Sequence, residues 1–168
     1  MTTLEPGTNL RPSAALNLVA PYNAPATGPR SLPQAVREAV RSVDESTLHP
    51  VARLDAGLAF QPKTLLGLLT YCYAREIYGS AEIEDVLRRD THFRQLCADE
   101  FPGARVIRSF RDANREVIRF NLLSVLCLLA EQKVLEGIVT KVNKAHLAEE
   151  ASRRITMAMF IDTMLDGD

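Results

Sequence analysis

The sequence predicts an all-α protein that folds as a compact multi-helix domain. Apolar residues recur at three- and four-residue intervals in most segments, Gly and Pro fall between these segments, and neither occurs from 104 to 133. With 168 residues, 46% hydrophobic and 24% charged, the chain has the balance of a globular protein and the length of one domain. We expect a helical domain over residues 31–142, a flexible Pro-rich arm over 1–30 and an added C-terminal helix over 143–168.

The arm is expected because residues 1–30 hold five of the nine prolines and show no sustained helical or strand period. Helical signals begin at Ser31, which stands three residues before Gln34, the spacing of a capping box. A helix should follow to about Val43. Its apolar side would consist of Leu32, Val36, Ala39, Val40 and Val43.

The centre of the core is expected in a second helix, which starts at Pro62, where a first-turn proline belongs. From Leu65 to Ile77 the apolar residues point nearly all round this helix, which indicates an element covered on several sides. Gly79 should end it, and Ser80 should cap the next helix.

That third helix begins with three carboxylates and ends with two arginines, an order that suits the helix dipole better than it indicates a cation site. These residues are Glu82, Glu84, Asp85, Arg88 and Arg89. A short fourth helix over 91–99 should offer Phe93, Leu96 and Cys97 to the core, before a turn at 101–103.

The stretch 104–133 allows one long helix or two in close succession. Within it, Leu122 to Leu129 is apolar on most sides, which indicates a buried helix or a subunit interface. Residues 137–142 are strand-like but too short to define a sheet. Asn143 can cap a final helix, whose apolar stripe is Leu147, Ala151, Ile155, Ala158, Met159 and Leu165.

Charge and hydropathy limit the functional classes. The formal net charge is −1 and the pI is near 6.3, far below the value of about 9 of strongly basic nucleic-acid-binding domains, so any contact with nucleic acid must be local. No apolar stretch approaches the roughly 20 residues that cross a bilayer, and the first 30 residues lack the pattern of a secretory signal. We therefore expect a cytoplasmic protein without a membrane partner.

We predict no catalytic residue, no metal and no cofactor. The chain holds three cysteines and three histidines, which are Cys72, Cys97, Cys127, His49, His92 and His146. The cysteines are widely spaced and are interpreted as buried thiols, and the histidines lack the spacing of metal ligands. No glycine-rich phosphate loop or nucleophile elbow is present, so the chain is not expected to be an enzyme.

A pattern typical of nucleic-acid binding lies between 104 and 119. At about 100° per residue, five arginines fall within roughly 120° of arc and four apolar residues fall opposite them. The arginines, called the arginine row below, are Arg105, Arg108, Arg111, Arg115 and Arg119, and the apolar residues are Val106, Phe110, Ala113 and Val117. Guanidinium groups bind phosphates bidentately and read guanine edges, so the row predicts a DNA-binding surface. Because Asp112 and Glu116 lie nearby, surface ion pairs are the alternative.

A longer pattern spans the middle of the chain. It consists of an aromatic-x-Pro segment, an apolar helix with a Tyr-Gly-Ser turn, an Ile-x-x-x-Leu-x-x-Asp helix, a Phe-Arg-x-Leu step and a further Phe-Arg segment. It is met by Phe60 to Ser80, Ile83 to Leu96 and Phe101 to Arg111. In this pattern the chain resembles the N-terminal helical domain of bacterial insertion-sequence transposases of the DDE class, over about residues 48–134.

The resemblance implies DNA recognition through a helix-turn-helix-like portion, and Arg105, Arg108 and Arg111 map to its motif. Val106 replaces a hydroxyl residue of the family, which would cost a phosphate or capping contact. After Val134 the family enters a strand with the first metal-binding aspartate of its catalytic domain, whereas this chain offers a short apolar stretch and a helix. Two catalytic metal ions cannot be held there, so the chain looks like a transposase DNA-binding domain without its nuclease.

Two functional hypotheses follow. The first is a non-catalytic, transposase-derived DNA-binding module or regulator, in which a homodimer would read paired half-sites on double-stranded DNA. The second is a helical scaffold that kept the fold, lost DNA binding and uses Leu122–Leu129 or the C-terminal helix for self-association or a protein partner. Strongly salt-dependent binding to duplex DNA favours the first, and a hetero-complex that persists at high salt favours the second.

Overall fold

The computed structural model describes residues 31–51, 60–97 and 101–166, and in these ranges the chain forms seven α-helices, one 3-10 helix and no strand. The elements are α2 (Leu32–Arg41), η1 (Glu45–Thr47), α3 (Pro62–Ala74), α4 (Ser80–Arg89), α5 (Thr91–Leu96), α6 (Ala104–Ala113), α7 (Arg115–Leu135) and α8 (Lys144–Asp166). The predicted all-α class is confirmed. The predicted arm, residues 1–30, lies outside the described residues.

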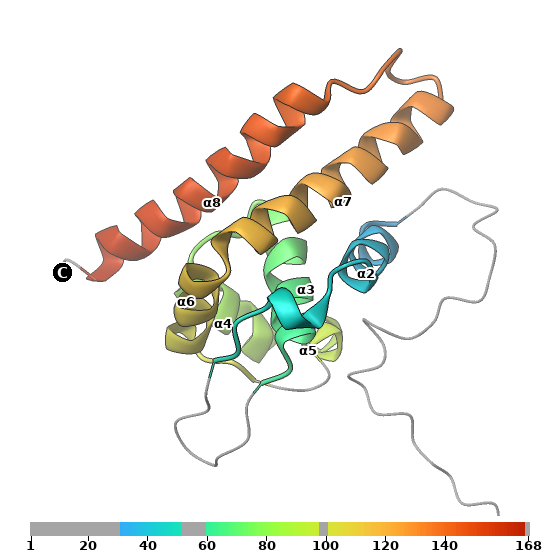
Figure 1. The fold of residues 1–168 in the computed structure, drawn as a ribbon. Coiled ribbons are helices and arrows are strands. Elements are labelled where there is room, and N and C mark those ends of the chain that lie inside the picture. The colour runs from blue at the N-terminus through green and yellow to red at the C-terminus, as the bar shows by residue number, and fades with distance from the viewer. Residues whose placement is uncertain (1–30, 52–59, 98–100, 167–168) are drawn as a thin grey trace, which may run out of the picture.

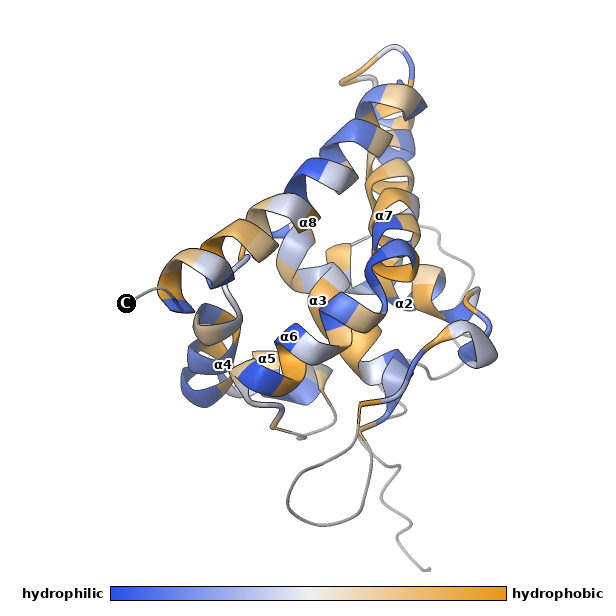
Figure 2. Cartoon of the chain, turned by 60° about the vertical axis from the view of Figure 1, so that its left-hand side comes forward, coloured by the Kyte–Doolittle hydropathy of each residue, from blue (hydrophilic) through white to orange (hydrophobic). Residues whose placement is uncertain are grey.

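The helix α3 occupies the centre of the fold. Figure 1 shows α2 on one side of it and α4 and α6 on the other, with α7 packed across the body and α8 on the outside, running back along α7. Figure 2 shows that α3 is largely apolar, and nine of its 13 residues are buried. The prediction that this helix is the centre of the core is therefore confirmed.

The capping box predicted at the start of the first helix is present. The N–H of Gln34 donates to Oγ of Ser31 at 3.4 Å, and the N–H of Ser31 donates to Oε1 of Gln34 at 3.0 Å. From this start α2 buries Val36, Ala39 and Val40, as its apolar spacing predicts.

The helix α3 ends at Ala74, five residues before Gly79, which was predicted to end it. Glu76 adopts a left-handed conformation with φ of 61°, and the N–H of Ile77 donates to the carbonyl oxygen of Cys72 at 2.9 Å. This hydrogen bond spans six residues and is the outer one of a Schellman motif. The motif pairs a carbonyl that the helix end leaves free, and it turns the chain away from the helix axis.

The stretch 104–133 forms two helices, because Asn114 interrupts it with φ of −126° and ψ of 22°. Its side chain is buried and pairs with the backbone of His49: Oδ1 accepts from the N–H at 2.7 Å, and Nδ2 donates to the carbonyl oxygen at 3.0 Å. The break between α6 and α7 is therefore fixed by a contact with a segment 65 residues away.

The strand-like residues 137–142 form no strand and belong to the connection between α7 and α8. Asn143 caps α8 as predicted, since its Oδ1 accepts from the N–H of His146 at 3.2 Å. Three residues of the predicted stripe are buried: Ala151, Ile155 and Ala158. Leu165 is 59% exposed, so the prediction fails at the last turn, which extends past the body.

Two of the cysteines, Cys72 and Cys97, are buried as predicted, whereas Cys127 is half-buried. Burial raises the pKa of the Cys72 thiol well above its usual range, as expected for an unreactive structural cysteine. None of the helices in the described ranges is long and apolar enough to cross a membrane.

Candidate nucleic-acid interface

The arginine row runs along α6 and the first turns of α7. Arg105 and Arg115 are exposed, and the side chains of Arg108 and Arg119 are 31% and 26% exposed. The side chain of Arg111 is only 4% exposed. The expectation of a single outward-facing row is therefore wrong at Arg111, because α8 covers this position.

The buried side of α6 is also rotated from the predicted one. Phe110 is buried as expected, but Ala113 is exposed and Ile107 is buried in its stead. Val106 and Val117 are half-buried. The helical-wheel prediction assumed one straight helix with a single partner surface, whereas α6 is followed by a break and is covered by α8 on the Arg111 side.

Arg111 forms a buried ion pair with Asp162 of α8, in which Nη1 donates to Oδ2. The other carboxylate oxygen, Oδ1, accepts two hydrogen bonds from Ser80: one from its N–H at 2.8 Å and one from its hydroxyl at 2.9 Å. A buried ion pair is tolerated when further hydrogen bonds satisfy its remaining atoms, and Ser80 does this for Asp162.

The prediction that Ser80 caps α4 is wrong, because Gly79 is the N-cap and the Ser80 hydroxyl is directed to α8. Glu84 also has a longer-range role than the one predicted. Its Oε2 accepts from the N–H of Ala104 at 2.8 Å, and the carboxylate pairs with Arg88. A negative charge from α4 therefore already occupies the positive N-terminal end of α6.

The surroundings of Arg111 maintain its charge. Burial opposes the charged form, but the hydrogen bond to Asp162 and the nearby acidic groups raise the pKa of Arg111 overall. Tyr73 of α3 lies close to it and is a buried phenol whose pKa is raised by burial. Its hydroxyl is buried next to the Arg111 guanidinium, so polar groups of α3, α6 and α8 meet at this junction.

Two further arginines of the row contact α8. Arg108 forms an ion pair with Asp166, whose side chain is 61% exposed. Nη1 of Arg115 lies 3.8 Å from Sδ of Met159. Together with the buried pair, these contacts place α8 against the middle of the arginine row.

The ends of the row are differently placed. Arg105 forms no ion pair with any residue in the described part of the chain. Arg119 pairs with Glu116 at 2.9 Å, and its Cζ lies 4.4 Å from the ring centroid of the exposed Phe120. Within the described ranges, Arg105 thus presents a guanidinium without a charged partner, and the guanidinium of Arg119 has one exposed partner, Glu116.

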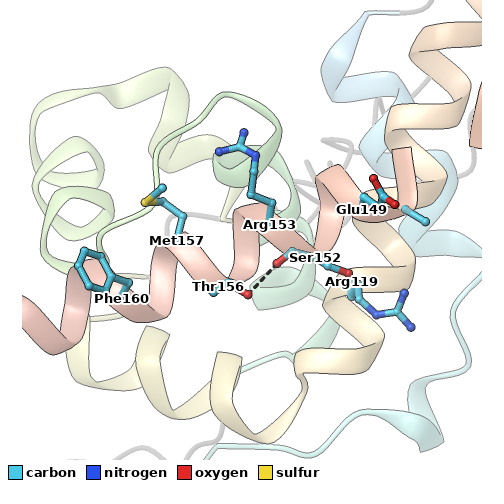
Figure 3. Close-up of a pocket in the computed structure, with 8 residues that line it drawn as sticks. Arg119, Glu149, Ser152, Arg153, Thr156, Met157 and Phe160 are labelled. Atoms are coloured by element: carbon cyan, nitrogen blue, oxygen red, sulfur yellow. Dashed lines mark hydrogen bonds between the residues drawn. The ribbon is translucent and has the colours of Figure 1, made fainter. Parts of the chain in front are cut away.

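A hollow of about 680 Å³ opens beside Arg119, between α7 and α8 (Figure 3). Its lining residues are Arg119, Ala148, Glu149, Ser152, Arg153, Thr156, Met157 and Phe160. Apart from Arg119, all of them lie on α8. The hollow joins charged and apolar side chains and is open to a ligand or to another protein surface.

No group of three or more His, Cys, Asp or Glu residues within the described ranges is arranged to hold a metal ion. His49 is held by its backbone to Asn114, and the backbone of His146 is bound to the cap of α8. The side chain of His92 lies outside the described part. The candidate site is therefore the arginine row and the face of α8 that contacts it.

Sequence reasoning missed the residues that organise this site: Asp162, Ser80 in its actual role, and Asn114. A signal for Asp162 was present, since 151, 155, 158 and 162 follow helical spacing and place a carboxylate on the apolar stripe of α8. A buried carboxylate requires a cationic or hydrogen-bonding partner, and the arginine row supplies cations.

Comparison with known proteins gives one match. Residues 31–113 match a family model described as Transposase domain (DUF772). The matched segment comprises α2 to α6 and contains Arg105, Arg108 and Arg111, whereas α7 and α8 lie beyond it. No curated protein and no solved structure matches the chain.

Proposed function

Since residues 31–113 match a transposase domain family, we propose that this chain is a non-catalytic, transposase-derived DNA-binding module or regulator. The observation that carries the proposal is the arginine row, which lies in and directly after the matched segment. Four of its five guanidinium groups reach the surface.

The chemistry of the row fits a DNA backbone. Each guanidinium presents a planar fork of donors that suits a phosphate, and residues on one side of consecutive helices can follow a strand. Arg105 is exposed and has no acidic partner in the described ranges, so binding a phosphate there breaks no ion pair within these ranges. Because the net charge is −1, attraction to DNA must come from this local surface.

Fluorescence anisotropy of a labelled duplex at low and moderate salt tests the proposal. Arg105→Gln and Arg119→Gln should each weaken binding and lower the slope of log affinity against log salt by about one, the value for one lost phosphate contact. The matched control is Arg41→Gln on α2, which lies on the other side of α3 from α6 (Figure 1) and loses the same charge.

The outcomes separate cleanly. Weakening in both row variants with an unchanged control supports DNA binding by the row. Equal weakening in all three variants would point to net charge alone, and absence of binding at micromolar protein in low salt contradicts the proposal.

A second candidate function is protein–protein interaction, favoured by apolar side chains at the surface. Phe160, Met164 and Leu165 of α8 are each more than half exposed. Leu122 and Val125 of α7 are buried within the chain, so less of the Leu122–Leu129 surface is free for a dimer than the sequence predicts. A complex that survives high salt in light-scattering chromatography and is lost in Phe160→Ser would favour this function.

A further inference from the structure

The contacts between α8 and the arginine row follow a register. Along α8 the contacting residues are Met159, Asp162 and Asp166, and along the row their partners are Arg115, Arg111 and Arg108. Positions three and four residues apart on α8 share one side of that helix, and they meet Arg115 at the start of α7 and then Arg111 and Arg108 of α6 in antiparallel order. Two of the three contacts are ion pairs in which a carboxylate of α8 binds a guanidinium.

The two carboxylates bind the guanidinium groups of Arg108 and Arg111, to which a DNA phosphate would bind. An aspartate and a phosphate both offer oxygen acceptors to the same guanidinium fork. While Asp162 and Asp166 are in place, Arg111 is covered and Arg108 is committed to a carboxylate. Arg105 and Arg115 remain exposed, and Arg119 is partly exposed and paired with Glu116.

The C-terminal half of α8 is held weakly by apolar contacts. From 158 to 166 the buried residues are Ala158 and Asp162, while Phe160, Met164 and Leu165 are exposed. The N-terminal half has a separate anchor, because Arg154 donates to the carbonyl oxygens of Tyr73 and Ala74 at 2.9 and 3.0 Å. The two halves of α8 thus have separate attachments, and in residues 158–166 the buried polar contact is the ion pair of Asp162 with Arg111, beside the half-buried Met159 and Ile161.

We propose that residues 158–166 of α8 form an autoinhibitory cover on the arginine row, and that duplex DNA binds fully when this segment is displaced and its phosphates replace Asp162 and Asp166. This inference rests on the proposed DNA-binding function and adds its regulation. Displacement returns Asp162 and Ser80 to water and leaves Arg108 and Arg111 facing the DNA backbone. The exchange keeps both guanidinium groups paired with an anion in each state.

A reversible disulfide that holds the cover closed tests the proposal. A Cβ at Gly79 would lie 3.2 Å from Cγ2 of Ile161, so side chains at these two positions touch, and Gly79→Cys with Ile161→Cys is the pair chosen for the clamp. Anisotropy of a labelled duplex is measured on the oxidised and the reduced double variant. Gly79→Cys alone, treated in the same way, is the matched control for the native cysteines.

The oxidised clamp should bind the duplex at least about fivefold more weakly than the same protein after reduction, and the control should show no redox dependence. Equal affinity in both redox states overturns the cover but leaves the proposed function intact. Absence of binding in both states and in the wild type contradicts the proposed function and the cover together.

A surface variant gives a second readout without a change in the core. Asp166→Asn removes the ion pair to Arg108, and Glu131→Gln removes the same charge from an exposed position on α7. The proposal predicts about threefold tighter duplex binding for Asp166→Asn than for Glu131→Gln. Equal affinities of these two variants contradict it.

Discussion

Two helices of this protein, α3 and α8, are attached to the rest of the chain by different forces. The buried side chains of α3 are mostly apolar, and they make this helix the centre of the core. The buried residues of α8 are Ala151, Ile155, Ala158 and Asp162, so one position of four is a charge. Its other anchors are hydrogen bonds from Arg154 to the end of α3.

The two helices differ in the free energy that it costs to separate them from their neighbours. Separating α3 from its neighbours exposes apolar surface, which costs free energy in proportion to area. Opening the end of α8 instead returns a carboxylate and a guanidinium to water, and hydration recovers much of what the buried pair loses. A helix held in the second way can be released by a competing anion without unfolding of the core.

The largest effect should come from the core. Leu68→Ala in α3 removes a fully buried side chain and should lower the free energy of unfolding by about 2–5 kcal/mol. Urea unfolding followed by circular dichroism measures this loss. The conservative Leu68→Met variant is the control and should lose less than about 1.5 kcal/mol. A loss in Leu68→Ala as small as that expected for the control would argue against close packing around α3.

An intermediate effect is expected at the attachment of α8. Asp162→Ala leaves Arg111 and Ser80 without their acceptor and should cost roughly 1–3 kcal/mol. Hydrogen exchange should rise in residues 158–166 and remain slow in α3, because local opening lets Arg111 reach water. Uniformly faster exchange in both helices would show that α8 is not a separable element.

The smallest effect concerns pH. Hydrogen bonds from Arg153 and Arg154 lower the pKa of Glu150 from 4.5 to about 2. Because the folded-state pKa is depressed, the stabilisation is complete above pH 4.5 and is lost as the pH falls from 4.5 to about 2. At pH 7 the free energy of unfolding of the wild type should exceed that of Glu150→Gln by no more than about 1 kcal/mol, since Arg153 is half-exposed and solvent screens its pair with Glu150.

Urea unfolding of both proteins at pH 7, 4.5, 3 and 2 checks this window. The difference between them should disappear by pH 2. A difference that stays constant below pH 4.5 would show that Glu150 contributes through packing and not through its charge.

Local signals predicted much of the fold. The capping box at Ser31 and Gln34 and the cap Asn143 of α8 bind backbone N–H groups within three residues, so the local sequence predicts them directly. Pro62 at the start of α3 is equally local, because it has no N–H that the first turn would leave unpaired. The sequence does not decide whether 104–133 forms one helix or two. The side chain of Asn114, which marks the break, bonds to His49, and a partner 65 residues away leaves no short-range pattern.

The site was predicted less completely for the same reason. The helical wheel placed the five arginines on one side, but whether a side is exposed depends on what packs against it. Arg111 is buried by Asp162, which lies 51 residues further along the chain. The sequence thus predicted the cations of the row, and the tertiary structure determined which of them α8 covers.

Hydrogen exchange of the wild-type protein with and without a saturating DNA duplex tests the central claim most directly. We predict that residues 158–166 exchange faster in the complex, while 144–155 and α3 keep their protection. Unchanged or slower exchange at 158–166 in a complex that does form would contradict the claim that this segment covers the arginine row and is displaced by DNA.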